Sequence, residues 1–198
     1  MKVFNIKVYG IEQSLIRAGY PYQTEVNEDM DTMIAQHSIT PQMLARGKKL
    51  GNTDIGSGHS NYLKGIIVQM DITAPQYWWQ QAQRYHWFDI ISSQSKMHKL
   101  TEMNLGDMLY SGVGSTAIKN VQGYIEMYHD DKCDFEDILD NLPMGFEYTA
   151  GITTNYLQLR TMHSQRRNHR LSQWQIFCDV VEQLPLFKML CLGGLDEE

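Results

Sequence analysis

Residues 66 to 73 alternate strictly between two sets of side chains, and this alternation constrains the fold more than any other feature. One set is entirely apolar and comprises Ile66, Val68, Met70 and Ile72. A period of two residues is that of a β-strand with one buried face. Pro75 follows, and because proline is favoured in the first turn of a helix, we predict a helix from Pro75 to about His86. The chain is therefore expected to combine strands with helices.

The remaining elements are predicted from the same two periodicities and from their caps. A further strand is expected over Lys2–Val8. Helices are expected over Ile11–Ala18, from Thr40-Pro41 to Leu50, over Ser115–Met127 and Phe135–Leu142, and as one long stretch over Asn155–Leu184, which holds no Gly or Pro. The sequence shows no repeat and no linker. We therefore predict a single α+β domain over residues 1–198, rich in helix and with a small sheet.

Composition excludes several classes of protein. The 198 residues are 42% hydrophobic and 20% charged, as in an ordinary globular chain, and no apolar stretch is long enough to span a bilayer. The first ten residues do not resemble a signal peptide, so the cytoplasm is the expected location. Three cysteines are too few and too scattered for a disulfide framework. The net charge of −6 argues against a protein that coats nucleic acid, and membrane association is not expected.

The segment Ala74–Lys99 mixes large rings with amides and cations. Trp78, Trp79 and Trp87 alternate with glutamines, an arginine and a histidine. Such a mixture suits a pocket that stacks a planar ring and hydrogen-bonds its edge. The alternative is a partly buried helix whose tryptophans belong to the core and whose glutamines face solvent. Composition alone leaves both interpretations open.

A polar run follows the aromatic segment, formed by Ser92, Ser93, Gln94 and Ser95. Hydroxyls beside an amide can hold the edge of a uracil-like base, or can simply cap the next helix. No G-x-S-x-G sequence is present, so Ser95 is not predicted to be a hydrolase nucleophile. No metal site is predicted, because the histidines and cysteines lack the spacing of metal ligands.

The predicted long C-terminal helix carries a basic face. At 100° per residue, five side chains fall within an arc of about 80°. They are Arg160, His163, Arg167, Arg170 and Trp174, with Arg166 just beside them. Clustered guanidinium groups can bind phosphate or carboxylate. A solvated basic face and a contact for single-stranded nucleic acid are the two alternatives.

Several of these residues resemble the flavin-dependent thymidylate synthase family, whose signature is Arg-His-Arg followed by a serine seven residues later. Ala74-Pro75, Gln81 and Arg84 are similar to the family's Ala-Pro, its substrate-contacting Gln and the first Arg of its signature. In the same register, His59 falls on a histidine near the flavin. Asn155 falls on a flavin-contacting Asn, and Arg166 or Arg167 falls near a base-contacting Arg. The pair Gln173-Trp174 is similar to the family's closing Gln-Trp.

The resemblance implies a helix-rich α+β fold with a small, mainly antiparallel sheet. It also implies a homotetramer with shared sites, and FAD-dependent methylation of dUMP with NADPH and methylenetetrahydrofolate as co-substrates. Catalytic roles would fall to Arg84 and Ser95. The cofactor would be bound by His59, Arg84, Tyr85, His86 and Asn155, and the nucleotide by Gln81, Ser93, Gln94, Ser95, Lys96, Arg166 and Arg167.

The sequence also departs from the family. The signature reads Arg84-Tyr85-His86, and one extra residue separates it from Ser95. Two of the family's ligand-contacting arginines fall on Leu139 and Leu157. A charge-assisted hydrogen bond contributes about 1.5–3 kcal/mol, so two losses could weaken nucleotide binding a hundredfold or more. The sequence thus predicts either a flavoenzyme acting on dUMP or a related pyrimidine nucleotide, or a non-catalytic member of the fold that binds a nucleotide or a partner.

Overall fold

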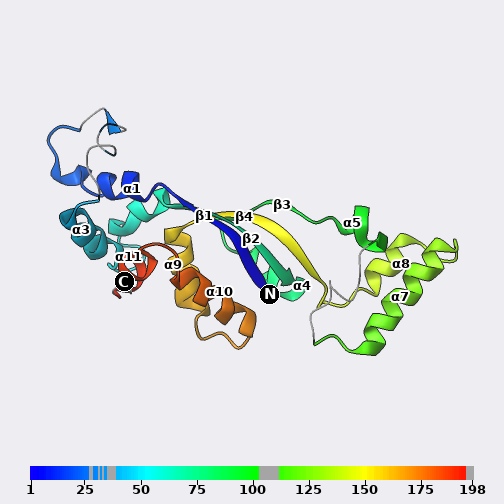
Figure 1. The fold of residues 1–198 in the computed structure, drawn as a ribbon. Coiled ribbons are helices and arrows are strands. Elements are labelled where there is room, and N and C mark those ends of the chain that lie inside the picture. Colours follow the sequence, from blue (N-terminus) through cyan, green and yellow to red (C-terminus); the bar gives the residue numbers. More distant parts are fainter. Residues whose placement is uncertain (27–28, 31, 33, 35–38, 103–111, 195–198) are drawn as a thin grey trace.

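One antiparallel sheet of four strands organises the chain (Figure 1). The computed structural model describes residues 1–26, 29–30, 32, 34, 39–102 and 112–194. The strand order is β1-β2-β4-β3, with β1 at Lys2–Tyr9, β2 at Ile67–Pro75, β4 at Glu147–Asn155 and β3 at Phe88–Ser93. The α+β class, the small antiparallel sheet and the strands predicted near residues 2–8 and 66–73 are confirmed.

The central pair of strands sets the register of the sheet. β2 and β4 are paired along their whole lengths, from Ile67 opposite Asn155 to Pro75 opposite Glu147. The apolar alternation of β2 lies on the buried face, where Val68 and Ile72 are fully buried. Each end of this pair leads directly into a helix, so the residues that follow Pro75 and Asn155 start at opposite ends of the sheet.

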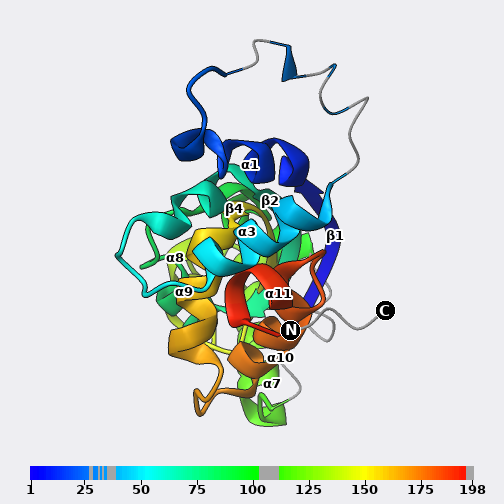
Figure 2. The same cartoon turned by 90° about the vertical axis from the view of Figure 1, so that its left-hand side faces the viewer.

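Helices cover one face of the sheet and both of its ends (Figures 1 and 2). α9 (Tyr156–Arg166) and α10 (Ser172–Glu182) pack against the sheet together with α4 (Gln76–Ala82). At one end lie α1 (Ile11–Arg17), α3 (Pro41–Gly51), α11 (Phe187–Leu192) and the 3-10 turns η1 (Tyr20–Tyr22) and η2 (His59–Gly65). At the other end lie α5 (Lys96–Lys99), η3 (Leu100–Glu102), α7 (Ser115–His129) and α8 (Phe135–Asp140).

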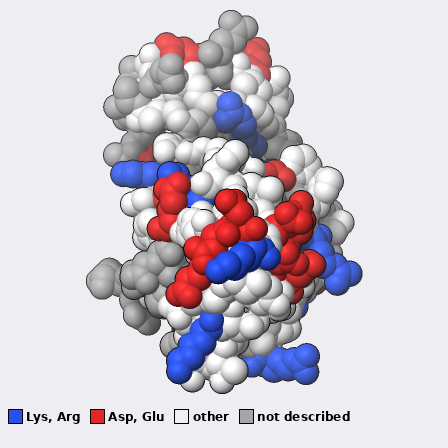
Figure 3. Space-filling view, turned by 90° about the vertical axis from the view of Figure 1, so that its right-hand side faces the viewer, with Lys and Arg blue, Asp and Glu red and all other residues white. Residues whose placement is uncertain are grey.

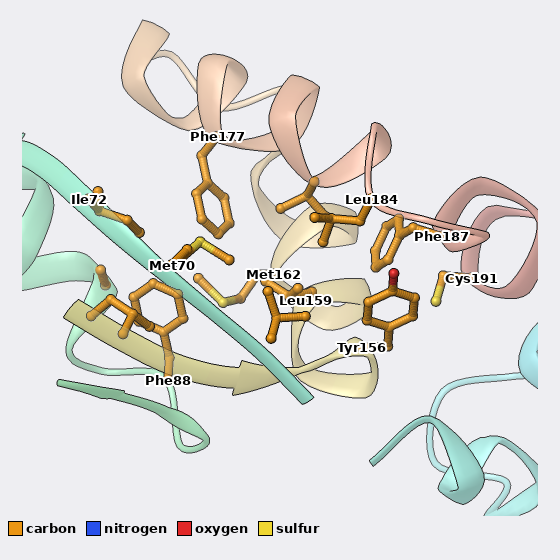
Figure 4. Packing of buried hydrophobic residues seen from close by; sticks show 14 of the residues in the cluster. Met70, Ile72, Phe88, Tyr156, Leu159, Met162, Phe177, Leu184, Phe187 and Cys191 are labelled. Carbon is orange, nitrogen blue, oxygen red and sulfur yellow. The ribbon is translucent and has the colours of Figure 1, made fainter. Parts of the chain in front are cut away.

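The main core lies between β2, β3 and the C-terminal helices. Figure 4 shows Met70 and Ile72 of β2 and Phe88 of β3 facing Met162 and Phe177 of the helical layer. The aromatic segment contributes to the same core, because Trp78 and Trp79 are at most 1% exposed whereas Trp87 is 58% exposed. Two of the three tryptophans of this segment, Trp78 and Trp79, therefore belong to the hydrophobic core, as the alternative interpretation predicted.

The predicted long helix over Asn155–Leu184 is wrong. The chain leaves helical geometry after Arg166 and re-enters it at Ser172. His169 Nδ1 accepts from the amide of Leu171 at 3.1 Å, and Gln175 Nε2 donates to the carbonyl of His169 at 3.0 Å. These side chains satisfy backbone groups that a continuous helix would have paired, and the break carries no Gly or Pro. The predicted basic arc spans this break and is lost with it.

The helix after Pro75 is shorter than predicted, and β3 was not predicted. α4 ends at Ala82, and the chain turns through residues 83–87 into β3. The turn is fixed by Thr154, whose hydroxyl donates to the carbonyl of Trp87 at 2.7 Å. Trp87 has a φ of 54°, a left-handed conformation uncommon for a large residue, and no local pattern signals it. The serine-rich end of β3 hid the strand from a search for alternation.

Helices α7 and α8 form an arm with its own small core of Leu100, Val121, Ile138 and Phe146. Residues 115–140 hold seven carboxylates against two lysines, a net charge of −5. Acidic side chains gather on the face of the molecule seen from this end (Figure 3). Because the whole chain carries −6, the rest of the molecule is nearly neutral. In the described segments no helix combines the length and apolarity needed to cross a membrane.

Candidate functional site

Helix α4 presents two polar faces to two different environments. Gln76, Gln80 and Gln83 fall on one side at helical spacing and line a pocket of about 300 Å³. Gln81 lies roughly 130° around the helix from the centre of this row and contacts α9 and α10 instead. The glutamines of α4 therefore belong to two separate sites, the pocket and the contact with α9 and α10.

The pocket brings together three of the predicted nucleotide-binding residues, Ser93, Gln94 and Lys96. Lys96 Nζ donates to Gln76 Oε1 at 2.8 Å across it. Gln94 is held at the rim by Thr149, whose amide donates to the Gln94 side chain at 2.8 Å. Trp79 and Tyr148 form the apolar wall, with ring centroids 5.3 Å apart and a 22° interplanar angle. Amides around one cation can bind a polar ligand that carries a single negative charge.

Strand β3 contains a β-bulge between the Arg84-Tyr85-His86 run and Ser95. Ile90 pairs with Ile152 and Ser92 with the adjacent Gly151, so Ile91 has no counterpart in β4. A one-residue slip would otherwise exchange the two faces of the strand beyond it. Ser95 occupies the position before α5, where its side chain makes no capping hydrogen bond.

On the other side of α4, an arginine is enclosed by aromatic rings. The guanidinium carbon of Arg166 lies 4.8 Å from the Trp174 ring and 5.4 Å from the Tyr85 ring. Arg166 Nε donates to the Tyr85 hydroxyl at 2.7 Å, and Arg166 Nη1 approaches Gln81 Oε1 at 3.5 Å. The same Gln81 oxygen accepts from Trp174 Nε1 at 3.0 Å. The predicted residues Gln81, Tyr85 and Arg166 thus form one cluster.

The other basic residues of the predicted arc have different partners. Arg167 Nη1 lies 2.5 Å from Asp179 Oδ1, and its Nε lies 3.4 Å from Glu182 Oε1. Arg160 is 9% exposed and donates to the carbonyl of Thr53 at 2.6 Å. The basic side chains therefore do not form the single helix face on which the predictions of anion binding and of nucleic-acid binding both depended. Arg166 is the cation of the cluster that it forms with Gln81 and Tyr85.

Asn155 and the signature residues lie at the same end of the β2–β4 pair. Asn155 ends β4 and caps α9, with its side-chain oxygen accepting from the amide of Gln158 at 2.9 Å. Trp87 is joined to the neighbouring Thr154, so the turn that carries Arg84 and His86 lies beside this cap. Arg84 and His86 are exposed. The turn therefore presents two basic side chains to solvent from a fixed backbone.

His59 lies in a second pocket, of about 480 Å³, at the α1–α3 end of the molecule. Arg17, Tyr22, Asn61 and Tyr62 also line it. Burial is the main cause of a raised pKa for the Tyr62 phenol, and the nearby Arg160 partly opposes it.

Two buried arginine nitrogens near the His59 pocket lack hydrogen-bond partners among the described residues, Arg160 Nη1 and Arg46 Nε. Within the same residues, Arg17, Arg46 and Arg160 form no ion pair. Uncompensated guanidinium groups favour an anionic ligand at this end of the molecule.

Sequence reasoning missed the amide row of the first pocket. Gln76, Gln80 and Gln83 stand at i, i+4 and i+7, and this spacing could have identified the row. Tyr148 carried no local signal, because its ring reaches the pocket only through the pairing of β4 with its neighbours.

Neither a protein-family model nor a curated protein matches the sequence. Two solved structures are similar over the whole chain. One is the flavin-dependent thymidylate synthase ThyX from Helicobacter pylori complexed with FAD and dUMP, with a TM-score of 0.74, 14% identity, and 99% of this chain and 100% of that one covered. The other is ThyX from the same organism with FAD and dUMP, with a TM-score of 0.75, 12% identity and 100% of both chains covered. The chain therefore has the fold of flavin-dependent thymidylate synthase from end to end.

Proposed function

We propose that this protein acts in the cytoplasm as a flavin-dependent thymidylate synthase-like enzyme on dUMP or a related pyrimidine nucleotide. The observation that carries the proposal is the agreement between fold and site. The fold is shared along the whole chain with structures that hold FAD and dUMP, and the side chains selected by resemblance meet in a few clusters around one sheet.

The residues present fit a flavin dinucleotide. His59 would contact it from the second pocket, and Arg84, Tyr85, His86 and Asn155 from the turn and cap at the same end of the β2–β4 pair. The uncompensated Arg17, Arg46 and Arg160 suit a ligand with two phosphates. When bound, FAD would supply the hydride for methylation, with NADPH as reductant and methylenetetrahydrofolate as one-carbon donor.

The nucleotide residues fall on opposite sides of α4, which supports a shared site. Gln81 and Arg166 are on one side, and Ser93, Gln94 and Lys96 with the adjacent Ser95 are on the other. Within one chain, helix α4 separates the two sets. A homotetramer in which facing chains contribute different sets removes this separation.

The direct test is the visible absorbance spectrum of the purified protein before and after adding FAD, followed by oxidation of the reduced flavin with and without dUMP. Arg84→Ala should weaken FAD binding because it removes an exposed guanidinium. Ser95→Ala should lower dUMP-dependent oxidation while FAD stays bound. A protein that neither carries nor binds FAD would contradict the proposal.

A specific observation supports a non-catalytic alternative. Leu139 and Leu157, at two positions where the family has arginines, pack against the arm core and the main core respectively. Their apolar surroundings favour packing over ligand contact. In this case nucleotides would raise the melting temperature without turnover. Oxidation of reduced flavin that depends on dUMP would exclude this alternative.

A further inference from the structure

Arg166 carries a charge for which the described residues provide no counter-ion. The two carboxylates of α10 that form ion pairs, Asp179 and Glu182, are engaged by Arg167 and His163. Arg166 is partly buried, and its partners are neutral oxygens and rings. A guanidinium has five N–H groups, and two of them form hydrogen bonds with residues that the structure describes, at 2.7 and 3.5 Å. The remaining donors are available to a ligand rich in acceptor oxygens.

Tyr85 sets the orientation of this guanidinium in two ways. Its ring centroid lies 5.4 Å from the guanidinium carbon, beside the Trp174 ring, which it meets edge-on at a centroid distance of 6.1 Å. Its hydroxyl accepts from Arg166 Nε and donates to Gln165 Oε1 at 2.9 Å, so the direction of the hydrogen bonds is fixed. With Nε held in this way, the two Nη groups are the ones left to face a ligand.

We propose that Tyr85 is a positioning residue that holds the Arg166 guanidinium ready to bind acceptor oxygens of the nucleotide, either a phosphate or a base carbonyl. The inference rests on the proposed function for the identity of the ligand. The contact between Tyr85 and Arg166 itself rests on the geometry alone. Position 85, where this sequence departs from the family signature, thus has a physical role in this chain: its tyrosine orients Arg166.

Tyr85→Phe is the sharpest perturbation, because it keeps the ring and removes only the hydroxyl. Tyr77→Phe is the matched control, since the Tyr77 hydroxyl lies on the same segment but accepts from Gln173 Nε2 at 2.7 Å. The readout is the ¹⁵N–¹H NMR signal of Arg166 Nε, assigned with Arg166→Gln, during titration with dUMP, deoxyuridine and inorganic phosphate. The three probes distinguish a phosphate contact from a base contact.

In the wild-type protein, dUMP should move the Arg166 Nε signal. Tyr85→Phe should broaden this signal in the free protein and weaken dUMP binding about tenfold, as expected for one hydrogen bond to a charged group. Tyr77→Phe should change neither quantity. In the Arg166→Gln background, Tyr85→Phe should have less than a twofold further effect, because Tyr85 acts through Arg166.

An unchanged Arg166 signal and an unchanged dUMP affinity in Tyr85→Phe would overturn the inference, as would an equal loss of affinity with and without Arg166. If dUMP binds without moving the signal, the nucleotide site is elsewhere: the inference fails and the proposed function stands. If phosphate moves the signal and dUMP binds no tighter than phosphate, the proposed function loses its support and the positioning of Arg166 stands. If no probe moves the signal or binds, both fail.

Discussion

Two neighbouring tryptophans with the same burial should respond differently to the same substitution. Trp78 and Trp79 are 0% and 1% exposed, and both pack among aromatic rings. Their indole nitrogens differ. Trp79 Nε1 donates to the carbonyl of Tyr148 at 3.3 Å, whereas Trp78 Nε1 is buried and has no partner among the described residues. Replacement of each by Phe therefore separates the hydrogen-bonding contribution from the packing contribution.

The packing cost should be similar at both positions. Phe is smaller than Trp by roughly 40 Å³, which at about 24 cal/mol per Å³ of residual cavity costs about 1 kcal/mol, and the lost apolar contact adds about 1–2 kcal/mol. Trp79→Phe also loses a hydrogen bond of about 1 kcal/mol. Trp78→Phe instead removes an unsatisfied buried donor, which returns about 1–2 kcal/mol. We expect Trp79→Phe to be the more destabilising by about 2 kcal/mol.

The assay is urea unfolding followed by far-UV circular dichroism, with the free energy of unfolding extrapolated to water. Circular dichroism avoids the change in tryptophan fluorescence that the substitutions themselves cause. Trp87→Phe is the control, because Trp87 is 58% exposed and should change the free energy of unfolding by less than about 1 kcal/mol. Equal losses for Trp78→Phe and Trp79→Phe, or a larger loss for Trp78→Phe, would refute the reasoning.

Three further predictions follow from local geometry. Gly51→Ala would place a Cβ 2.1 Å from the Leu190 carbonyl oxygen and should lower the free energy of unfolding by more than about 3 kcal/mol. Gly123 has open space around it in α7, so Gly123→Ala should raise the free energy of unfolding by about 0.5–1 kcal/mol. Thermal unfolding measures both changes. Burial raises the pKa of the Cys178 thiol to about 11 and also raises that of Cys191. The pKa of the Cys133 thiol is raised as well, but Cys133 is only partly buried whereas the other two are buried. In the native protein at neutral pH iodoacetamide should therefore modify Cys133 first, while all three react in urea, and mass spectrometry of the peptides distinguishes these outcomes. Burial, with smaller contributions from Arg166 and Arg170, lowers the pKa of His169. Because the unfolded chain then binds a proton more readily, stability should fall as the pH drops below about 6.5, and His169→Gln should reduce this dependence in denaturation series across pH 5 to 8.

The parts of the fold that could be predicted are those encoded by local periodicity. The alternation of β2 and the Thr40-Pro41 start of α3 are readable because each is determined by a few adjacent residues, and Thr40 does accept from the amide of Met43. The break between α9 and α10 is different. It depends on His169 and Gln175 bonding to backbone groups within a turn, and such bonds leave no mark on hydrophobic spacing.

The candidate site was predictable residue by residue but not in its arrangement. Resemblance selected Gln81, Arg166 and Lys96, yet it placed them around one nucleotide, whereas α4 separates them. The position of a residue in the sequence gives the direction of its side chain around a helix, but it does not tell which other element of the fold packs against that side of the helix. For the same reason Tyr85 could be recognised as a departure from the family, but its contact with Arg166 depends on how α9 meets the turn after α4.

The two faces of α4 lead to a last prediction, about which chains build one site. If Arg166 comes from one chain and Lys96 from another, Arg166→Gln and Lys96→Ala should each weaken dUMP binding at every site when purified alone, so that neither variant has a site of wild-type affinity. A mixture refolded at equal amounts should recover about a quarter of the sites, because half of the chains supply each intact face. Isothermal titration calorimetry measures this stoichiometry without any need for turnover. If the site lies within one chain, no mixture recovers binding, because every chain then carries a defect in its own site. Partial recovery would therefore locate the nucleotide between subunits, and its absence from soluble, correctly assembled mixtures would place the whole site within one chain. Unchanged dUMP binding by either variant alone would assign the Gln81–Arg166 cluster and the amide pocket to different ligands.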